Sequence, residues 1–127
     1  DIELILIKPY GFDLSEKSVR RAGLDYWKNV RLTEFETFED FIREKSPAKD
    51  SLFLFSKAGE KSYFDAPFKE NCYLIFGSET KGLPPSVLEG NKSNTYKLPM
   101  FNNHVRSLNL SNVATAVGYE CLRKLNL

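Results

Sequence analysis

The sequence is poor in the residues that build metal sites and disulfides. Among its 127 residues it has one histidine, His104, and two cysteines, Cys72 and Cys121. One histidine is too few for the usual metal clusters and suggests no Ser-His-Asp constellation, so we expect no metal and interpret His104 as a bystander in a loop. Both cysteines lie in apolar segments, where reduced core thiols are favoured over a disulfide. This cysteine usage predicts a cytoplasmic protein.

Long apolar runs and an excess of one charge are also lacking. No stretch approaches the roughly 18 apolar residues of a membrane span, and no secretory segment is visible. The net charge of +1, with a pI near 7.9, gives no global argument for nucleic-acid binding. Any RNA contact must therefore be local. Basic residues cluster at Lys17, Arg20, Arg21, Lys28 and Arg31, although such a cluster is also typical of a solvated face.

What is present is the composition of one globular domain. Hydrophobic residues make up 42% of the chain and charged residues 28%, which is ordinary for a folded protein. The chain is long enough to bury a hydrophobic core without needing disulfides or metal ions for stability. It shows no internal repeat, low-complexity tract or linker. We therefore expect a single domain, residues 1–127.

Short apolar runs alternate with amphipathic segments along the chain. The apolar runs predict strands at Glu3–Ile7, Val30–Leu32, Ser51–Ser56, Cys72–Phe76 and Thr95–Leu98. The other segments predict helices at Leu14–Ala22, Phe38–Glu44, Leu83–Gly90 and about Leu108–Leu125. Asp13 with Glu16 matches a capping box, Thr37 is the expected N-cap of the second helix, and Gly23 lies where a helix C′ residue would. The alternation predicts an α/β fold with a mainly parallel sheet flanked by helices.

The first candidate ligand segment is FGSETKGLP, which follows the strand that ends at Phe76. Two glycines five positions apart invite a phosphate-loop interpretation, but that motif requires Lys and Ser or Thr directly after the second glycine. Leu83 and Pro84 stand there instead, and the dinucleotide fingerprint G-x-G-x-x-G is absent. Gly77 and Gly82 therefore indicate either a ligand loop or a plain tight turn.

The second candidate segment, KLPMFNNHVRSLNLSN, runs from a strand end into the last predicted helix. Free N–H groups at a helix start bind anions, and Arg106 adds a planar fork for phosphate or carboxylate. The alternative is that Ser107 or Asn109 only caps the helix and that Asn112 bonds nearby backbone. Strand, tight loop and helix start together are typical of nucleotide-like ligand sites in α/β proteins.

Three aromatic residues have both a structural and a functional interpretation. Tyr119 lies near the edge of the apolar stripe of the last helix, which favours core packing with a bonded hydroxyl over an active-site role. Tyr26 and Trp27 are interpreted as packing or interface residues rather than as base-stacking platforms.

Three segments in this order resemble the SPOUT-superfamily RNA 2′-O-ribose methyltransferases. They are RRAGLDYW at Arg20–Trp27, IFGSETKGLP at Ile75–Pro84, and LPM, RSLNLSN and YE between Leu98 and Glu120. Within the superfamily they look like the TrmL type, the tRNA (cytidine/uridine) 2′-O-methyltransferases that act on the wobble nucleotide of the anticodon. The resemblance covers essentially the whole chain.

The resemblance implies a SPOUT (α/β-knot) domain with a deep C-terminal trefoil knot, which general rules on chain threading would not have proposed. It further implies a homodimer that binds S-adenosyl-L-methionine in the knotted loops and takes tRNA as its partner. The positions that match cofactor contacts are Phe55, Ser56, Gly77, Leu98, Met100 and Ser107. The positions that match catalysis or RNA binding are Glu79, Arg106, Asn112 and Tyr119.

These positions agree with the chemistry of the reaction. Phe55, Leu98 and Met100 would form a flat apolar slot for an adenine ring. Arg106 would hold the phosphate beside the target ribose, and Tyr119 would bond the substrate or lie near its hydroxyl.

The sequence also departs from the family. Members begin with a strand and helix that carry an Asn and Arg motif, whereas Glu3–Ile7 matches their second strand, so we expect that first unit to be missing here. One extra residue lies between Met100 and Arg106 relative to the bacterial pattern. Two alternatives stay open: a non-catalytic RNA-binding or dimerisation module of the same fold, and a SPOUT 2′-O-methyltransferase of rRNA, against which RRAGLDYW argues.

Overall fold

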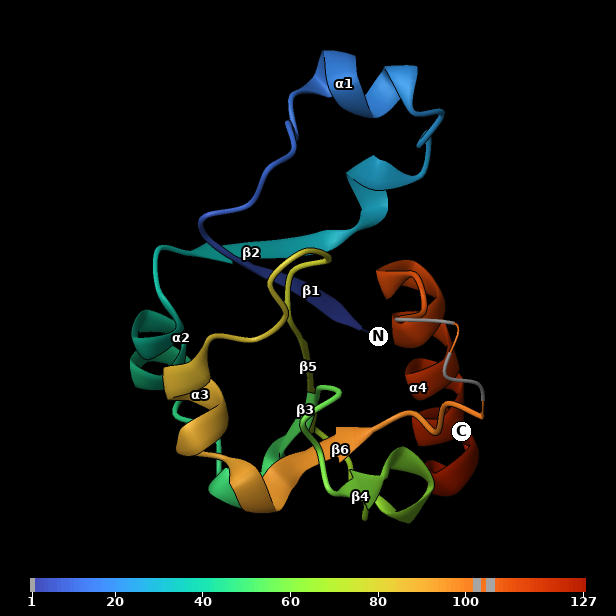
Figure 1. The fold of residues 1–127 in the computed structure, drawn as a ribbon. Coiled ribbons are helices and arrows are strands. Elements are labelled where there is room, and N and C mark those ends of the chain that lie inside the picture. The colour runs from blue at the N-terminus through green and yellow to red at the C-terminus, as the bar shows by residue number, and fades with distance from the viewer. Residues whose placement is uncertain (1, 102–103, 105–106) are drawn as a thin grey trace. The chain divides into compact units, whose positions relative to one another are not determined.

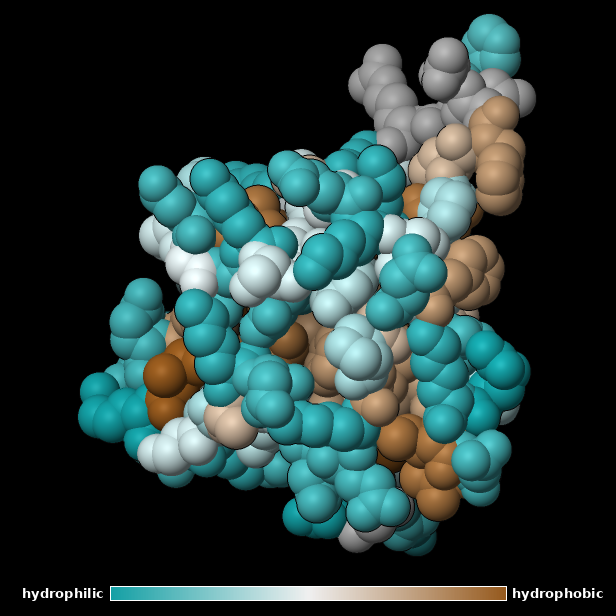
Figure 2. Space-filling view, turned by 90° about the horizontal axis from the view of Figure 1, so that it is seen from below, coloured by the Kyte–Doolittle hydropathy of each residue, from teal (hydrophilic) through white to brown (hydrophobic). Residues whose placement is uncertain are grey.

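The computed structural model describes residues 2–101, 104 and 107–127. These residues form two compact units, unit 1 from Asp1 to Ser46 and unit 2 from Pro47 to Leu127. Within the described part of the chain, no helix is long and apolar enough to cross a membrane. One face of the molecule is mostly hydrophilic, with hydrophobic side chains in small separate groups (Figure 2).

Unit 1 is a parallel strand pair with its crossover connection and one covering helix. Its elements are β1 (Glu3–Ile7), α1 (Glu16–Arg21), the short 3-10 helix η1 (Trp27–Asn29), β2 (Arg31–Phe35) and α2 (Phe38–Lys45). The two strands run parallel, with Glu3 opposite Arg31 and Ile7 opposite Phe35. Phe41 of α2 is buried and meets Phe35 edge-on, with ring centroids 5.8 Å apart. This contact fixes α2 against β2.

The helix caps of unit 1 confirm one prediction and correct another. Thr37 is the N-cap of α2, because its hydroxyl accepts a bond from the Asp40 N–H at 3.1 Å. The N-cap of α1 is Ser15 and not Asp13, so the helix begins at Glu16. Asp13 instead accepts bonds from the Ser15 and Ser18 hydroxyls, which places it one turn outside the helix. The predicted start at Leu14 was therefore wrong by two residues.

Unit 2 contains a four-stranded sheet in which every pairing is parallel. Its strands are β3 (Leu52–Phe55), β4 (Lys61–Ser62), β5 (Tyr73–Phe76) and β6 (Thr95–Lys97), in the order β4-β6-β3-β5 (Figure 1). Phe55 of the central strand β3 lies opposite Phe76 on one side and Tyr96 on the other. β4 is too short for the hydrophobic pattern to predict. The predicted parallel sheet flanked by helices is confirmed.

The other elements of unit 2 are mostly short. They are η2 (Lys49–Ser51), η3 (Tyr63–Asp65), α3 (Pro85–Glu89), η4 (Lys92–Asn94) and α4 (Leu110–Leu125). α4 packs its apolar stripe on the sheet, with Val117 completely buried and Cys121 6% exposed. The core beneath it is aromatic and includes Phe53, Phe55, Phe68 and Tyr96.

The strand order of unit 2 is unusual in one respect. β6 is the last strand in the chain, yet it lies between β3 and β4, which follow each other in sequence. The chain therefore returns late and inserts between two elements already connected. The trefoil knot is compatible with this order and stays a prediction.

Candidate functional site

Three of the predicted cofactor positions lie at the same edge of the four-stranded sheet. Ser56, Gly77 and Leu98 each come directly after a strand, β3, β5 and β6 respectively. Since these strands are parallel and Phe55 is in register with both neighbours, their carboxyl ends meet at one edge. The Ser56 N–H donates to the Tyr96 carbonyl at 2.9 Å, which ties two of these ends together. The structure thus brings the two candidate segments to one place.

The Gly77–Gly82 segment is a closed turn. Ser78 and Gly82 bond to each other in both directions, at 2.9 and 3.3 Å, and Gly82 has φ +68°. A Cβ on Gly77 would lie 2.1 Å from the Gly82 carbonyl carbon, so no other residue fits there. Glu79 is exposed within this turn. The turn itself therefore requires the glycines, and its placement at the carboxyl edge makes it available to a ligand.

Gly59 also shapes this edge, although it was not among the predicted site residues. A Cβ on Gly59 would lie 2.5 Å from the Tyr96 carbonyl carbon and 2.9 Å from the Lys97 nitrogen. The turn after β3 is thereby pressed against the main chain of β6, and the Gly59 N–H donates to the Ser56 carbonyl at 3.0 Å. A glycine four residues after the end of a buried strand was the signal that could have predicted this contact.

The apolar residues predicted to form an adenine slot divide into two kinds. The Phe55 ring is 6% exposed and stacks on Phe76, with centroids 5.1 Å apart. It belongs to the core, so a ligand would reach Phe55 only through its main chain. Leu98 is half-buried and Met100 is 40% exposed. These two side chains remain available to line a slot beside the sheet edge.

The approach to α4 shows which residue caps the helix. The Asn109 side chain accepts a bond from the Ser111 N–H at 2.8 Å, so Asn109 is the N-cap and α4 begins at Leu110. Ser107 is exposed and makes no cap bond, which leaves its hydroxyl available to a ligand. Arg106 lies outside the described residues.

Two further predicted residues share one exposed face of α4. Asn112 and Tyr119 are seven positions apart, which places them on the same side of a helix, while Val117 faces the core. Tyr119 is 72% exposed, so the expectation that it packs in the core was wrong. Its hydroxyl is free to contact a substrate or a second chain.

α4 runs opposite to β5, so its start lies toward the carboxyl edge. Cys121 lies beside Cys72, which precedes β5. A helix rises about 1.5 Å per residue, so Leu110 lies roughly 16 Å along α4 from Cys121. Figure 1 shows the start of α4 and the Gly77–Gly82 turn toward the same end of unit 2.

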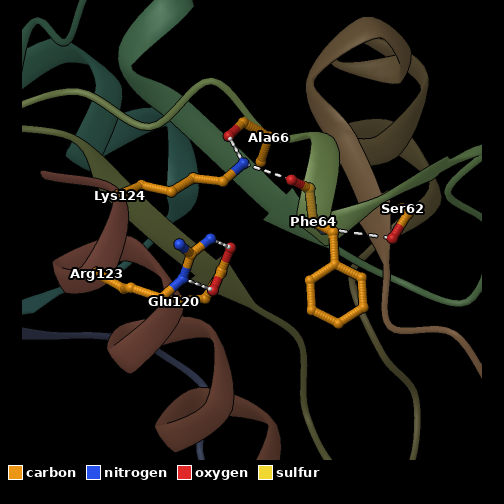
Figure 3. A network of polar contacts seen from close by, with 6 residues as sticks. All are labelled: Ser62, Phe64, Ala66, Glu120, Arg123 and Lys124. Carbon is orange, nitrogen blue, oxygen red and sulfur yellow. Dashed lines mark hydrogen bonds and ion pairs between the residues drawn. The ribbon is translucent and has the colours of Figure 1, made fainter.

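The C-terminal half of α4 is anchored by polar contacts (Figure 3). The Lys124 ammonium donates to the Ala66 carbonyl at 2.9 Å and also to the Phe64 carbonyl. Arg123, the residue before Lys124, makes two bonds of 2.8 Å to the carboxylate of Glu120, which lies one turn earlier, and these bonds lower the pKa of Glu120. The Lys124 contacts tie the helix to the chain after β4, and they position the face that carries Asn112 and Tyr119.

The two cysteines are free thiols, as predicted. Their sulfur atoms lie 3.9 Å apart, with Cys121 buried and Cys72 half-buried. Burial, with the neighbouring Cys72 thiol, raises the pKa of Cys121 to about 12. Cys121 therefore stays protonated at neutral pH. Among the described residues no group of three or more His, Cys, Asp or Glu side chains is placed to hold a metal ion.

The chain belongs to the SpoU rRNA Methylase family, whose family model matches residues 1–119. A relative from Listeria innocua, named putative tRNA (cytidine(34)-2′-O)-methyltransferase, is 39% identical over 127 residues. That alignment covers 98% of this chain and 73% of the Listeria protein. The family is therefore established by sequence along nearly the whole chain.

Two solved structures extend this result to the fold. One, solved for work on the 2-OH methylation of C/U34 on tRNA, has a TM-score of 0.83 and 40% identity, and covers 98% of this chain and 79% of its own. The other is a SpoU methyltransferase from Streptomyces viridochromogenes in complex with AdoMet. It has a TM-score of 0.74 and 25% identity, and the match covers 98% of this chain and 50% of that one.

Proposed function

We propose that this protein is an S-adenosyl-L-methionine-dependent tRNA methyltransferase that modifies the ribose 2′-hydroxyl of nucleotide 34, the wobble nucleotide. The observation that carries the proposal is the meeting of Ser56, Gly77 and Leu98 at one sheet edge in a chain of the SpoU family. The names of relatives at about 40% identity support tRNA and nucleotide 34 as the target.

The residues at the sheet edge fit the cofactor. Main-chain groups at Ser56 and Gly77 would bind the polar edge of adenine and the methionine part, while Leu98 and Met100 would cover the ring. The exposed Ser107 hydroxyl would add a polar contact. When bound, S-adenosyl-L-methionine supplies an electrophilic methyl group. A SpoU neighbour in complex with AdoMet supports this choice.

The protein's own residues must position the ribose and assist loss of its proton. A 2′-hydroxyl is a weak nucleophile, and correct positioning contributes about 7–11 kcal/mol to such a reaction. We assign to Arg106 a bond to the phosphate beside the target ribose, and to Tyr119 a contact with the substrate near its hydroxyl. Glu79 and Asn112 are assigned to RNA contact or catalysis, since both are exposed.

Three further properties belong to the proposal. Residues 1–127 would act as one methyltransferase domain, since the family match spans both units. The protein would work as a homodimer, and the exposure of Tyr119 and Phe101, 72% and 97%, offers apolar surface for a second copy. Its free thiols favour the cytoplasm. Light scattering at several protein concentrations tests the dimer.

The experiment is methyl transfer from labelled cofactor. Purified protein is incubated with S-adenosyl-L-methionine and either unmodified tRNA or rRNA fragments, because the family description names rRNA. We expect label in tRNA alone, at the ribose of nucleotide 34. Cofactor binding without transfer to any RNA would contradict the proposed enzymatic activity and favour a non-catalytic binding module. Label in rRNA alone would show that rRNA, and not tRNA, is the substrate.

A further inference from the structure

One cluster of positive charge in unit 1 is not among the residues assigned to the cofactor. Residues 17–31 carry five basic side chains and a single acidic one, Asp25, although the net charge of the whole chain is only +1. Four of the basic residues lie on α1 and η1 and are together named the basic face: Lys17, Arg20, Arg21 and Lys28. All four are exposed. The three on α1 line a shallow hollow together with Glu16.

Part of the basic face has no partner within the protein. Arg20 pairs with Glu16 one turn earlier, at 2.5 Å. The nearby Asp13 carboxylate accepts hydrogen bonds from the Ser15 and Ser18 hydroxyls. Within the residues that the structure describes, no carboxylate pairs with Lys17 or Arg21. The free positive charge is therefore concentrated on one side of α1, since positions four apart share a helix face.

The stability of α1 explains some of these charges but not all of them. Arg20 and Arg21 lie in the last turn, where the helix dipole favours cations. Lys17 lies in the first turn, where the dipole disfavours a cation. It also stands four residues before Arg21, a like-charge spacing that destabilises a helix by a few tenths of a kcal/mol. The charge of Lys17 is thus unfavourable for the free helix, and the stability of α1 does not explain it.

A neighbouring aromatic residue indicates the kind of partner. After α1 the chain turns at Gly23, which has φ +71°, and the Leu24 N–H donates back to the Val19 carbonyl at 3.2 Å. Tyr26 follows this turn and is 57% exposed. Exposed cations and an exposed aromatic ring a few residues apart in the chain are a combination that binds single-stranded RNA, through the backbone and by base stacking.

We propose that the basic face docks the substrate RNA: Lys17, Arg21 and Lys28 contact phosphates, and Tyr26 stacks on an unpaired base. This inference rests on the proposed function, because it names the surface that holds the same RNA. Its contribution is to binding of the substrate and not to the methyl-transfer step.

The test compares two double variants that remove the same charge. Lys17→Gln with Arg21→Gln removes the unpaired cations, and Lys49→Gln with Lys92→Gln removes two exposed lysines that precede β3 and β6, away from the carboxyl edge. Binding of a fluorescent anticodon stem-loop RNA is measured by anisotropy over a range of salt concentrations. Each phosphate contact contributes about 0.7–0.9 to the slope of log K against log salt.

For the first variant we expect a salt slope smaller by about one to two and affinity about tenfold weaker at low salt. Its KM for tRNA should rise with kcat unchanged. Its resistance to denaturant should stay close to that of the wild type, because the helix dipole disfavours the charge of Lys17 but favours that of Arg21. The control variant should match the wild type. Tyr26→Ala should weaken RNA binding about tenfold without changing the slope.

An unchanged slope and KM in the first variant would overturn the inference while leaving methyl transfer intact. Loss of binding to anionic lipid vesicles, with RNA binding unchanged, would overturn it in favour of a membrane surface. If the wild-type protein binds RNA through these residues but transfers no methyl group, the proposed function fails and the docking surface stands.

Discussion

Gly59 and Tyr96 approach so closely that a Cβ on Gly59 would lie 2.5 Å from the Tyr96 carbonyl carbon. Gly59→Ala forces the turn after β3 away from β6, since main chain cannot yield as a flexible side chain does. We expect a loss of about 1–3 kcal/mol in the free energy of unfolding, as for overpacked cores. Because Ser56 moves with this turn, affinity for S-adenosyl-L-methionine should also fall. Denaturant unfolding and calorimetric titration measure the two effects.

Gly118→Ala and Gly11→Ala are the matched controls. At both glycines a Cβ would meet open space, with no neighbouring atom within 4 Å, and Gly118 lies inside α4. Gly118→Ala should therefore stabilise the protein by up to about 1 kcal/mol through helix propensity. A Gly59→Ala variant as stable as Gly11→Ala would contradict the close approach of the two chain segments.

The Cys121 thiol should be far less reactive than that of Cys72. The pKa of Cys121 is raised from 9.0 to about 12, so its folded state holds a proton that the unfolded chain releases. The resulting stabilisation is present below pH 9 and is lost as pH rises from about 9 toward 12. At pH 8, iodoacetamide should modify Cys72 first, and both cysteines equally in denaturant. Mass spectrometry of peptides reads this directly, and equal native rates would exclude a buried Cys121.

Glu3 should contribute an acid-sensitive part of the stability of unit 1. A bond from the Thr33 hydroxyl and bonds of 2.9 and 3.0 Å from Lys45 lower the pKa of Glu3 below its ordinary value of 4.5. The stabilisation is complete above pH 4.5 and is lost as pH falls through the lower folded pKa. Glu3→Gln should be less stable by about 1 kcal/mol at neutral pH. Its unfolding should also depend less on pH below 4.5, and an unchanged dependence would argue against these bonds.

Arg106→Ala should reduce kcat/KM on tRNA about 10- to 100-fold, because a bond to a charged phosphate contributes about 1.5–3 kcal/mol. Cofactor affinity should stay at the wild-type value. Arg43→Ala, which removes only a surface ion pair with Asp40, is the control and should keep full activity. Full turnover by Arg106→Ala would show that its assigned role is wrong.

Much of the fold could be predicted from short-range hydrophobic patterns in the sequence, because the same residues are buried in the folded protein. The run at Leu52–Phe55 is continuous and apolar because both faces of this central parallel strand are covered, and the edge strand Tyr73–Phe76 beside it is half-buried. The stripe containing Val117 and Cys121 predicted where α4 packs. Those same signals placed Gly77 directly after a strand, and the structure has it there, at the carboxyl end of β5.

Other features depend on contacts between distant residues, which one sequence does not display. The stripe of α4 suggested a buried Tyr119, but the ring lies two residues from Val117 and on the opposite side of the helix. The role of Gly59 depends on the path of β6, which lies about forty residues further along the chain and inserts beside β3. The strand order itself contradicts the usual adjacency of consecutive strands, so only family likeness could predict it.

The most direct test of the proposed activity uses two anticodon stem-loop RNAs that differ by one oxygen atom. One carries an ordinary ribose at nucleotide 34, and the other carries a 2′-deoxyribose there. With labelled S-adenosyl-L-methionine, we predict label in the first RNA, at nucleotide 34, and none in the second, although both should bind the protein. Equal labelling of the two RNAs would contradict 2′-O-methylation at this nucleotide.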